Sequence, residues 1–233
     1  MVLVLDPLRS AQASGSRGGD TFSHNRFGSY VRNRTIPVNP NTDLQVAIRS
    51  AMTEATLAWY DLLEEPQRDA WRIYAAGLPW QNKVGQVVYL TGHQHYCRSN
   101  VPRLQAALAR VDDGPVVIAL PYKDDAFAAA ADESDQTIDV TFDDTLPHYD
   151  LDGAATIILM GLPQLASREF FNGPWRLLGS IPGSVGTPPT SPVEFATLPF
   201  VVGAGQKIWL QARTSFADGR LSEPFFCTTV VTE

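Results

Sequence analysis

Helical periodicity begins abruptly at Thr42, after a segment that shows no regular hydrophobic period. Thr42 and Gln45 form a T-x-x-Q capping box, a pattern that satisfies free backbone N–H groups at a helix start. Apolar residues then recur at three- and four-residue steps as far as Leu63, which predicts one amphipathic helix. The expected apolar stripe consists of Leu44, Ile48, Met52, Ala55 and Trp59.

Two more helices are predicted before residue 112. The segment Glu64-Glu65-Pro66 places acidic residues and a proline where a helix start favours them, and the helix should end at Gly77. A second T-x-x-Q box, from Thr91 to Gln94, begins a third helix that Pro102 must kink or delay. An extended segment over residues 85–90 separates the two helices. The turn 112–115 is a predicted domain boundary.

Beyond that turn the hydrophobic period changes from about 3.6 to 2, which is typical of β-strands. Seven short strands are expected over residues 116–120, 137–142, 154–160, 175–181, 195–202, 207–216 and 225–231. Gly-, Pro-, Asp- and Ser-rich segments between them favour an antiparallel β-sandwich. The predicted fold class is therefore α+β, with an extended arm (1–41), a small helical domain (42–113) and a C-terminal sandwich (114–233).

Charge is distributed unevenly along these parts. Residues 1–42 carry five Arg and two Asp, whereas residues 112–233 carry six basic and seventeen acidic residues, and the whole chain has a net charge of −7. A basic arm before an acidic body could bind the body of a neighbouring copy. Cys97 and Cys227 lie in different predicted domains, so no disulfide is expected. The N-terminus lacks the pattern of a signal peptide, and no apolar run is long enough for a membrane span.

The last two predicted strands, with sequence KIWLQARTSFADGRLSEPFFCTTVV, resemble the final hairpin of a fibronectin type III domain. In that family an alternating strand is followed by a Gly-bearing turn, here 217–220, and by a Ser-x-Pro before the last strand. The likeness covers about 25 residues and implies the sandwich. It implies no ligand, because such folds host many functions.

The N-terminal half resembles a group of uncharacterised phage-associated proteins. The matching features are Gly15-Ser16-Arg17-Gly18-Gly19-Asp20-Thr21-Phe22, the arginines that follow, the helix start Asn41-Thr42-Asp43-Leu44-Gln45, Trp59 and Trp71, and Leu90-Thr91-Gly92. The likeness spans roughly residues 14–105. It implies a virion component assembled in the host cytoplasm, and it brings no catalytic motif to carry over.

Two clusters could in principle bind a metal ion. His93, His95 and Cys97 form H-x-H-x-C, but on a helix only His93 and Cys97 share a face, and two ligands do not close a site. The acidic residues lack the order of an EF-hand loop; they are Asp124, Asp125, Asp132, Asp143, Asp144, Asp150 and Asp152. We therefore expect no catalytic, cofactor or metal site, and no enzyme. Two alternatives stay open, a glycan-cleaving enzyme that uses acidic loop residues and a carbohydrate-binding adhesin. Exposed Tyr149, Phe170, Phe171 and Trp175 would favour the adhesin.

The arm is the strongest candidate for a binding segment. Its aromatic residues are too apolar for a free tail and have too few aliphatic neighbours to form a core, so ordering them requires a partner surface. The predicted partner-binding residues are Arg17, Phe22, Arg26, Phe27, Tyr30, Arg32 and Arg34. Interleaved basic and aromatic residues suit single-stranded nucleic acid, but the arm has no Lys and the chain is acidic. The expected partners are other copies of the chain and other virion proteins, with a host-surface glycan as the alternative, and neither nucleic acid nor a membrane.

Overall fold

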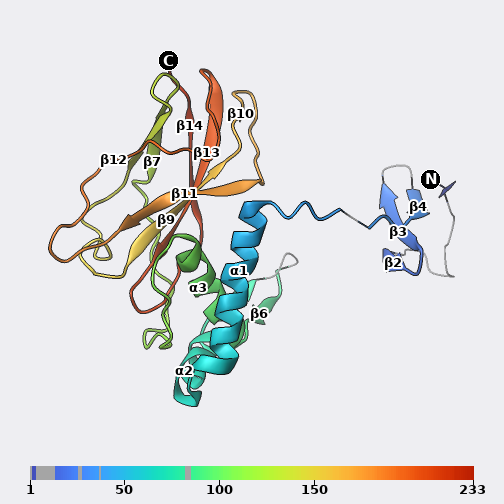
Figure 1. The fold of residues 1–233 in the computed structure, drawn as a ribbon, viewed down its shortest axis with the longest axis horizontal. Coiled ribbons are helices and arrows are strands. Elements are labelled where there is room, and N and C mark those ends of the chain that lie inside the picture. The colour runs from blue at the N-terminus through green and yellow to red at the C-terminus, as the bar shows by residue number, and fades with distance from the viewer. Residues whose placement is uncertain (1, 4–13, 26–27, 37, 82–84) are drawn as a thin grey trace. The chain divides into compact units, whose positions relative to one another are not determined.

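The computed structural model describes residues 2–3, 14–25, 28–36, 38–81 and 85–233. The chain divides into two compact units, residues 1–42 and 43–233. The described residues contain three α-helices and four antiparallel sheets, so the fold is α+β, as predicted (Figure 1). Within the described part of the chain, no helix has the length and apolar character that crossing a bilayer demands.

The first unit is a small antiparallel sheet. Its strands are β1 (Val2–Leu3), β2 (Gly15–Arg17), β3 (Asp20–Asn25) and β4 (Gly28–Asn33), in the order β1-β4-β3-β2. Gly18, at φ +61°, permits the tight turn between β2 and β3. The described strands of the segment predicted as an extended arm therefore pair with one another.

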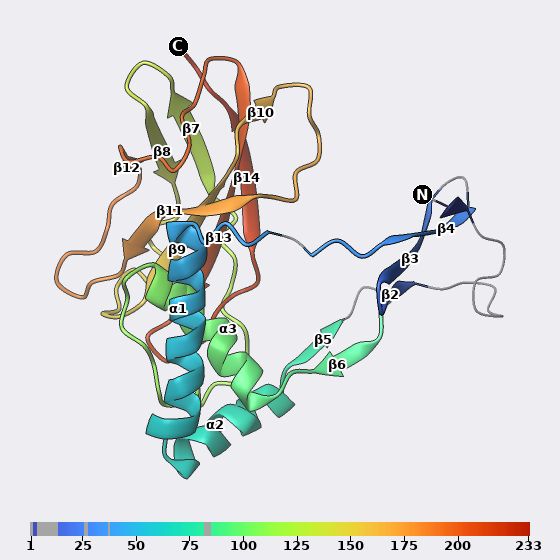
Figure 2. The same ribbon diagram turned by 45° about the vertical axis from the view of Figure 1, so that its right-hand side comes forward.

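Three helices open the second unit, which Figure 2 shows from another side. They are α1 (Asp43–Leu57), which continues as the π-helical η2 (Ala58–Leu62), α2 (Glu65–Ala76) and α3 (Gly92–Gln105). A hairpin of β5 (Pro79–Gln81) and β6 (Val87–Tyr89) joins α2 to α3. All three predicted helices are present. The Thr91–Gln94 capping box is formed, and α3 continues through Pro102 to Gln105.

An aromatic core holds the helices together. Trp59, Trp71, Tyr74 and Tyr96 are buried, and the Trp71 ring meets Tyr74 and Tyr96 edge-on at centroid distances of 5.9 and 5.5 Å. Such edge-to-face pairs stabilise a core beyond the area that they bury. Helix α1 packs through small residues, since Ala51 and Ala55 are the buried ones.

The predicted stripe of α1 is only partly buried. Leu44, Ile48 and Met52 were expected in the core, but their side chains are 49, 51 and 45% exposed. Helix α1 approaches its neighbours most closely at Ala51 and Ala55. The three larger side chains therefore lie at the edge of this contact. That part of the prediction was wrong.

The remainder of the second unit is antiparallel β-structure. Its strands are β7 (Ala128–Asp132), β8 (Thr137–Thr141), β9 (Ala155–Gly161), β10 (Gln164–Leu165), β11 (Trp175–Pro182), β12 (Val193–Phe195), β13 (Gln206–Ser215) and β14 (Phe225–Val230). One sheet has the order β12-β8-β7. The other runs β11-β9-β13-β14, with β10 added beside β13. Both sheets contribute to one apolar core that includes Ile138, Val140, Ile158, Met160 and Leu210.

Two strand predictions require correction. Residues 116–120 form no strand, and Val116 is 93% exposed. The first strand of the β12-β8-β7 sheet is instead the Ala-rich β7. Alanine has a weak β-propensity, so the sequence pattern did not predict this strand. The predicted strand 195–202 is reduced to β12, which ends at Phe195. The other five predicted strands agree with β8, β9, β11, β13 and β14 to within a residue or two.

The predicted boundary at residues 112–115 does not separate two compact bodies, since residues 43–233 form one unit. Trp71 Nε1 donates to the carbonyl of Asp112 at 3.0 Å, and the Tyr96 hydroxyl donates to the Asp112 carboxylate at 2.8 Å. Arg98 donates from α3 to the carbonyls of Leu221 and Ser222, both at 2.8 Å. These hydrogen bonds therefore connect α2 and α3 to the turn, and α3 to the segment between β13 and β14.

Candidate interaction surfaces

The first unit lacks a buried core in its described residues. From residue 14 to residue 50, every residue whose burial is described is half-buried or exposed. In the segment that leads to α1, Ile36 and Val38 are 87 and 90% exposed. A sheet that buries so little cannot offset the entropy of ordering its strands, which costs on the order of 1–2 kcal/mol per residue. This unit therefore carries the features of a binding segment.

Strand register places apolar side chains on both faces of this small sheet. Phe22 lies opposite Val31, whereas Tyr30 lies opposite Ser23. Because side chains alternate between the faces of a strand, Phe22 and Val31 share one face, and Tyr30 shares the other with Arg32. The unit thus presents two different surfaces, one on which Phe22 and Val31 lie beside the charged Arg17 and Asp20, and one that combines the Tyr30 ring with the Arg32 guanidinium group.

The structure brings most of the predicted partner-binding residues into this sheet. Arg17 is in β2, Phe22 in β3, and Tyr30 and Arg32 in β4. Arg34 follows β4, and its backbone N–H donates to the carbonyl of Gly19 at 2.7 Å. Arg26 and Phe27 lie outside the described residues. Whether these seven residues bind a partner stays a prediction.

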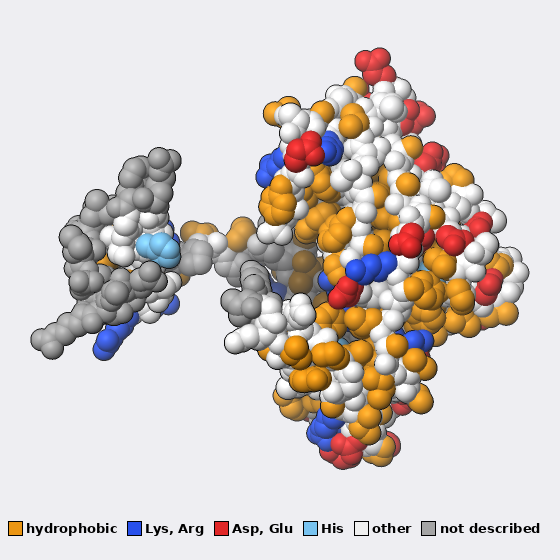
Figure 3. All heavy atoms as spheres, turned by 180° about the vertical axis from the view of Figure 1, so that it is seen from behind, with side chains coloured by type: hydrophobic (Ala, Val, Ile, Leu, Met, Phe, Trp, Pro, Cys, Tyr) orange, Lys and Arg blue, Asp and Glu red, His pale blue; other side chains and the backbone are white. Residues whose placement is uncertain are grey.

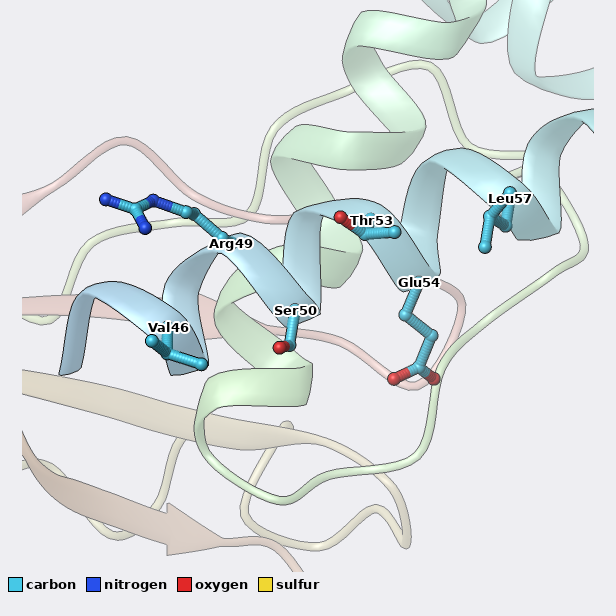
Figure 4. A pocket seen from close by; sticks show the side chains of 6 residues that line it. All are labelled: Val46, Arg49, Ser50, Thr53, Glu54 and Leu57. Atoms are coloured by element: carbon cyan, nitrogen blue, oxygen red, sulfur yellow. The ribbon is translucent and has the colours of Figure 1, made fainter. Parts of the chain in front are cut away.

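A second exposed surface lies along α1, on the side opposite its buried alanines. A shallow groove of about 440 Å³ follows this side, and its described lining residues all belong to α1 (Figure 4). They are Val46, Arg49, Ser50, Thr53, Glu54 and Leu57. Sequence reasoning missed this surface because it concentrated on the stripe that contains Ala55 and Trp59.

A third feature is an apolar cleft of about 340 Å³ between the helices and the larger sheet. Leu44 and Ile48 of α1 form one wall, Leu104 of α3 contributes to the lining, and Leu159 and Leu177 come from the strands. Hydrophobic side chains are spread over much of the face of this unit that Figure 3 shows. Clusters of exposed apolar residues of this kind mark surfaces that bind other molecules.

Aromatic residues cover part of the larger sheet beside this cleft. Phe171 stacks on Trp209 at a centroid distance of 5.2 Å and an interplanar angle of 17°, and it meets Trp175 edge-on. A Cβ at Gly161 would collide with the Phe171 ring, so this glycine makes the arrangement possible. Phe170 and Phe226 are 73 and 57% exposed. Tyr149, which was grouped with Phe170, Phe171 and Trp175 as a candidate aromatic contact, is instead fully buried.

The H-x-H-x-C cluster does not converge on one point. His93 Nε2 lies 3.3 Å from Cys97 Sγ, whereas His95 Nε2 accepts from Trp80 Nε1 at 3.2 Å. Burial lowers the pKa of His95 to about 4 and raises the pKa of the Cys97 thiol. In the part of the chain that the structure describes, no group of three or more His, Cys, Asp or Glu side chains could hold a metal ion.

The acidic residues of the loops have local structural partners. Asp124 accepts from the backbone N–H groups of Ala126 and Asp143, at 2.8 and 3.1 Å. Asp143 accepts from the Thr145 hydroxyl, and Asp152 from the backbone N–H of Val185. These hydrogen bonds close turns, as Asp side chains commonly do. They give no support to a paired-carboxylate site.

Three buried residues, His148, Tyr149 and Thr156, and the exposed Tyr122 form a hydrogen-bonded group at the start of β9. The Tyr122 hydroxyl lies 3.1 Å from His148 Nδ1, and His148 Nε2 lies 2.8 Å from Thr156 Oγ1. The Tyr149 hydroxyl completes the group, 2.9 Å from the same Thr156 oxygen. Burial lowers the pKa of His148 to about 4. Each of these side chains has a hydrogen-bond partner, so we interpret them as a satisfied structural network.

No protein-family model, curated protein or solved structure matches the chain.

Proposed function

We propose that this chain is a non-enzymatic structural protein of a tailed-bacteriophage particle that assembles through its N-terminal unit. In this proposal residues 14–34 bind a neighbouring copy or another virion protein. The body, residues 43–233, displays a domain of fibronectin or immunoglobulin type. The observation that carries the proposal is that no residue of known burial between 14 and 50 is buried.

Charge supports binding between copies. Residues 1–42 have a net charge of +3, whereas residues 43–233, with thirteen basic and twenty-three acidic residues, have a net charge of −10. Such asymmetry favours an encounter between the basic unit of one chain and the acidic body of another. The two open edges of the sheet, β1 and β2, offer backbone groups for strand addition.

Strand order supports a fibronectin-like sandwich in the body. If β7, β8, β9, β11, β12, β13 and β14 are named A, B, C, C′, E, F and G, the sheets read A-B-E and G-F-C-C′. This order is the one expected of a Greek-key sandwich of the immunoglobulin-like type, and the core residues that the two sheets share are consistent with the proposal. The assignment to a phage particle rests on the resemblance of residues 14–105 described above.

Deletion of residues 1–41 tests the proposal. We expect the full chain to form oligomers or to enter particles, and the truncated chain to do neither while its melting temperature stays unchanged. Phe22→Ser and Tyr30→Ser, one on each face of the sheet, identify the bound face, and Gly186→Ala in the body, where an added Cβ meets no atom within 4 Å, is the control. Assembly that survives the deletion would sink the proposal. Mass spectrometry of purified particles tests the virion location separately.

A glycan-binding adhesin is a second candidate, favoured by the aromatic residues Phe170, Trp175 and Phe226 on the larger sheet. Aromatic rings offer flat apolar faces for a ligand, although few convergent polar groups lie beside them here. A glycan array probed with the full chain distinguishes this candidate. Binding that Phe226→Ser abolishes would support it, and an array without hits would remove it.

A further inference from the structure

The apolar cleft between the helices and the larger sheet is lined by side chains that belong to neither buried core. Leu159 and Leu177 lie opposite each other on β9 and β11, and both line the cleft. Leu44 and Ile48 line it from α1, and their side chains are 49 and 51% exposed. The body therefore exposes apolar surface that its own cores do not cover, as binding sites commonly do.

The segment that precedes α1 carries apolar side chains that suit this cleft. Ile36 and Val38 are 87 and 90% exposed, and neither belongs to a helix or a strand. Pro37 and Pro40 lack a backbone N–H, and the residue before a proline favours an extended conformation. In an extended chain, residues two apart point to the same side. The segment is therefore suited to binding in a groove through its side chains rather than to pairing with a sheet edge.

We propose that residues 35–40 of one copy lie in this cleft on a second copy, with Ile36 and Val38 packed against its apolar lining. The contact is heterologous, because the segment and the cleft are different surfaces, so it can repeat from copy to copy. The inference rests on the proposed function and deepens it, since it names the surface of the neighbour that receives the arm.

Two observations favour a second copy over the cleft of the same chain. Ile36 and Val38 stay almost fully exposed in the single chain, so their own cleft does not hold them. The connection from Val38 to α1 is also short, since it consists of residues 39–42, which include Pro40. Within it the Asn41 N–H donates to Asn39 Oδ1 at 3.3 Å. Short, stiff connections favour the exchange of a segment between copies.

Charge complements this apolar contact. Among the described residues that line the cleft, Glu54 and Arg176 are the charged ones. Arg176 already donates to the carbonyl of Pro199 at 3.1 Å, whereas Glu54 is half-exposed and lies as far as 3.9 Å from Arg110, its partner within the body. Arg34, which is exposed, comes two residues before the apolar pair of the segment. A basic segment and an acidic carboxylate at the cleft favour the encounter of two copies.

Substitutions on each side of the contact test it in the full-length chain. The double variant Ile36→Ser/Val38→Ser changes side chains that are almost fully exposed in the single chain, so its melting temperature should equal that of the wild type. Its self-association, measured by sedimentation equilibrium, should weaken by about tenfold or more, because two apolar side chains lose their burial. Ile48→Ser should weaken it from the side of the cleft. Val116→Ser and Ile73→Ser are the controls, since they remove side chains that are 93 and 64% exposed elsewhere, and both should associate normally.

Cross-linking identifies which copy holds the segment. A mixture of Val38→Cys and Ile48→Cys chains should form a disulfide-linked dimer under mild oxidation, and faster than either variant alone. The native thiols should contribute little background, because burial raises the pKa of both Cys97 and Cys227. A chain with both substitutions that closes only an intramolecular bridge would show that its own cleft holds the segment, and it would overturn the proposal.

The failure of this inference and the failure of the proposed function give different results. If deletion of residues 1–41 abolishes assembly while Ile36→Ser/Val38→Ser and Ile48→Ser assemble like the wild type, the arm binds another surface and this inference alone is wrong. If the deletion has no effect on assembly, the proposed function is wrong, and this inference is wrong with it.

Discussion

Arg103 is buried among neutral hydrogen-bond acceptors, and it joins the helices to the strands. Its side chain is 2% exposed. The guanidinium donates to the carbonyls of Ala109 and Gly153 at 2.8 and 2.9 Å, and to the Ser215 hydroxyl at 2.8 Å. Burial lowers the pKa of Arg103. A buried cation without a bonded carboxylate is stable only where its donors are satisfied. The folded state therefore needs all of these hydrogen bonds at once.

Replacement of Arg103 with Met should lower the free energy of unfolding by about 2–4 kcal/mol, because three or more acceptors from separate segments lose their donor. Urea denaturation measures this change. Arg72→Met is the matched control, since Arg72 is half-exposed and its ion pairs with Glu65 and Asp69 lie on the surface. That variant should lose much less stability than Arg103→Met, because ion pairs on the surface contribute little. Equal losses in the two variants would contradict the structural role of Arg103.

His95 and His148 make stability depend on pH. Both are fully buried, and desolvation lowers the pKa of each to about 4, below the ordinary value of 6.5. The folded state therefore holds both rings neutral, whereas the unfolded state binds protons as pH falls through 6.5. The stability that the neutral rings confer is complete above about pH 6.5, and it is lost progressively as pH falls toward 4.

From pH 7 to pH 5 we expect each of these histidines to cost about 2 kcal/mol of unfolding free energy. His148→Gln should remove about half of the pH dependence between these values, although it also lowers stability at pH 7. Tyr122→Phe is the matched control, since it removes a hydrogen bond to His148 but keeps the titrating ring. Its pH dependence should equal that of the wild type. An unchanged slope in His148→Gln would refute this account.

At the scale of elements, the turn at residues 112–115 packs closely against the backbone of α2. A Cβ added at Gly114 would lie 2.6 Å from the backbone N of Trp71 and 2.6 Å from the backbone C of Ala70. Neither atom can move without disturbing the helix. The Trp71 side chain also donates to this turn. Glycine is therefore needed here for close approach of two backbones rather than for a special φ angle.

Gly114→Ala should destabilise the body by about 1–3 kcal/mol, the usual cost of forcing atoms into a packed site. Thermal unfolding followed by tryptophan fluorescence reports the change, because Trp71 lies at the contact. Gly186→Ala, where an added Cβ meets no atom within 4 Å, should leave the melting temperature unchanged. If Gly114→Ala melted like the wild type, the turn could not be packed as described.

The elements that the sequence predicts well are those with local signals. The Thr91 capping box locates the start of α3 to the residue, since it involves only four neighbouring positions, and the acidic residues with Pro66 locate the start of α2. The exposed side chains of Leu44 and Ile48 could not be foreseen. Whether the alanines or the larger residues of one stripe make the contact depends on how closely α1 approaches its neighbours. The Ala-rich β7 is a strand because β8 pairs with it, not because its residues favour one.

The candidate surfaces also divide into features that have a local sequence signal and features that only the folded chain creates. The seven arm residues were found from composition alone, because aromatic and Arg residues without aliphatic neighbours stand out in a sequence. Among those that the structure describes, the placement of Phe22 and Tyr30 on opposite faces of a sheet depends on strand register, which the chain alone does not reveal. The sequence also did not predict the aromatic cluster that packs over Gly161. Phe171, Trp175 and Trp209 come from separate segments that meet only in the folded sheet.

At the scale of the whole molecule, the two units differ in what stabilises them. The body has two apolar cores and buried ties between helices and strands. The N-terminal sheet relies on backbone hydrogen bonds and on cross-strand contacts such as that between the Ser16 and Thr21 hydroxyls at 2.8 Å. Such contacts contribute little each, so the first unit should open and close far more readily than the body unfolds.

Limited proteolysis should therefore separate the units. Trypsin should cleave first after Arg34, in the segment where Ile36 and Val38 are almost fully exposed, and release a body that begins at Thr35. The body should keep the melting temperature of the intact chain, because its cores lie within residues 43–233. Mass spectrometry identifies the first cut, and calorimetry compares the products. Once the chain is assembled, the same cut should slow markedly, since a partner would cover the arm. An assembled chain that is cut at Arg34 as fast as the free one would show that the arm is not at an interface.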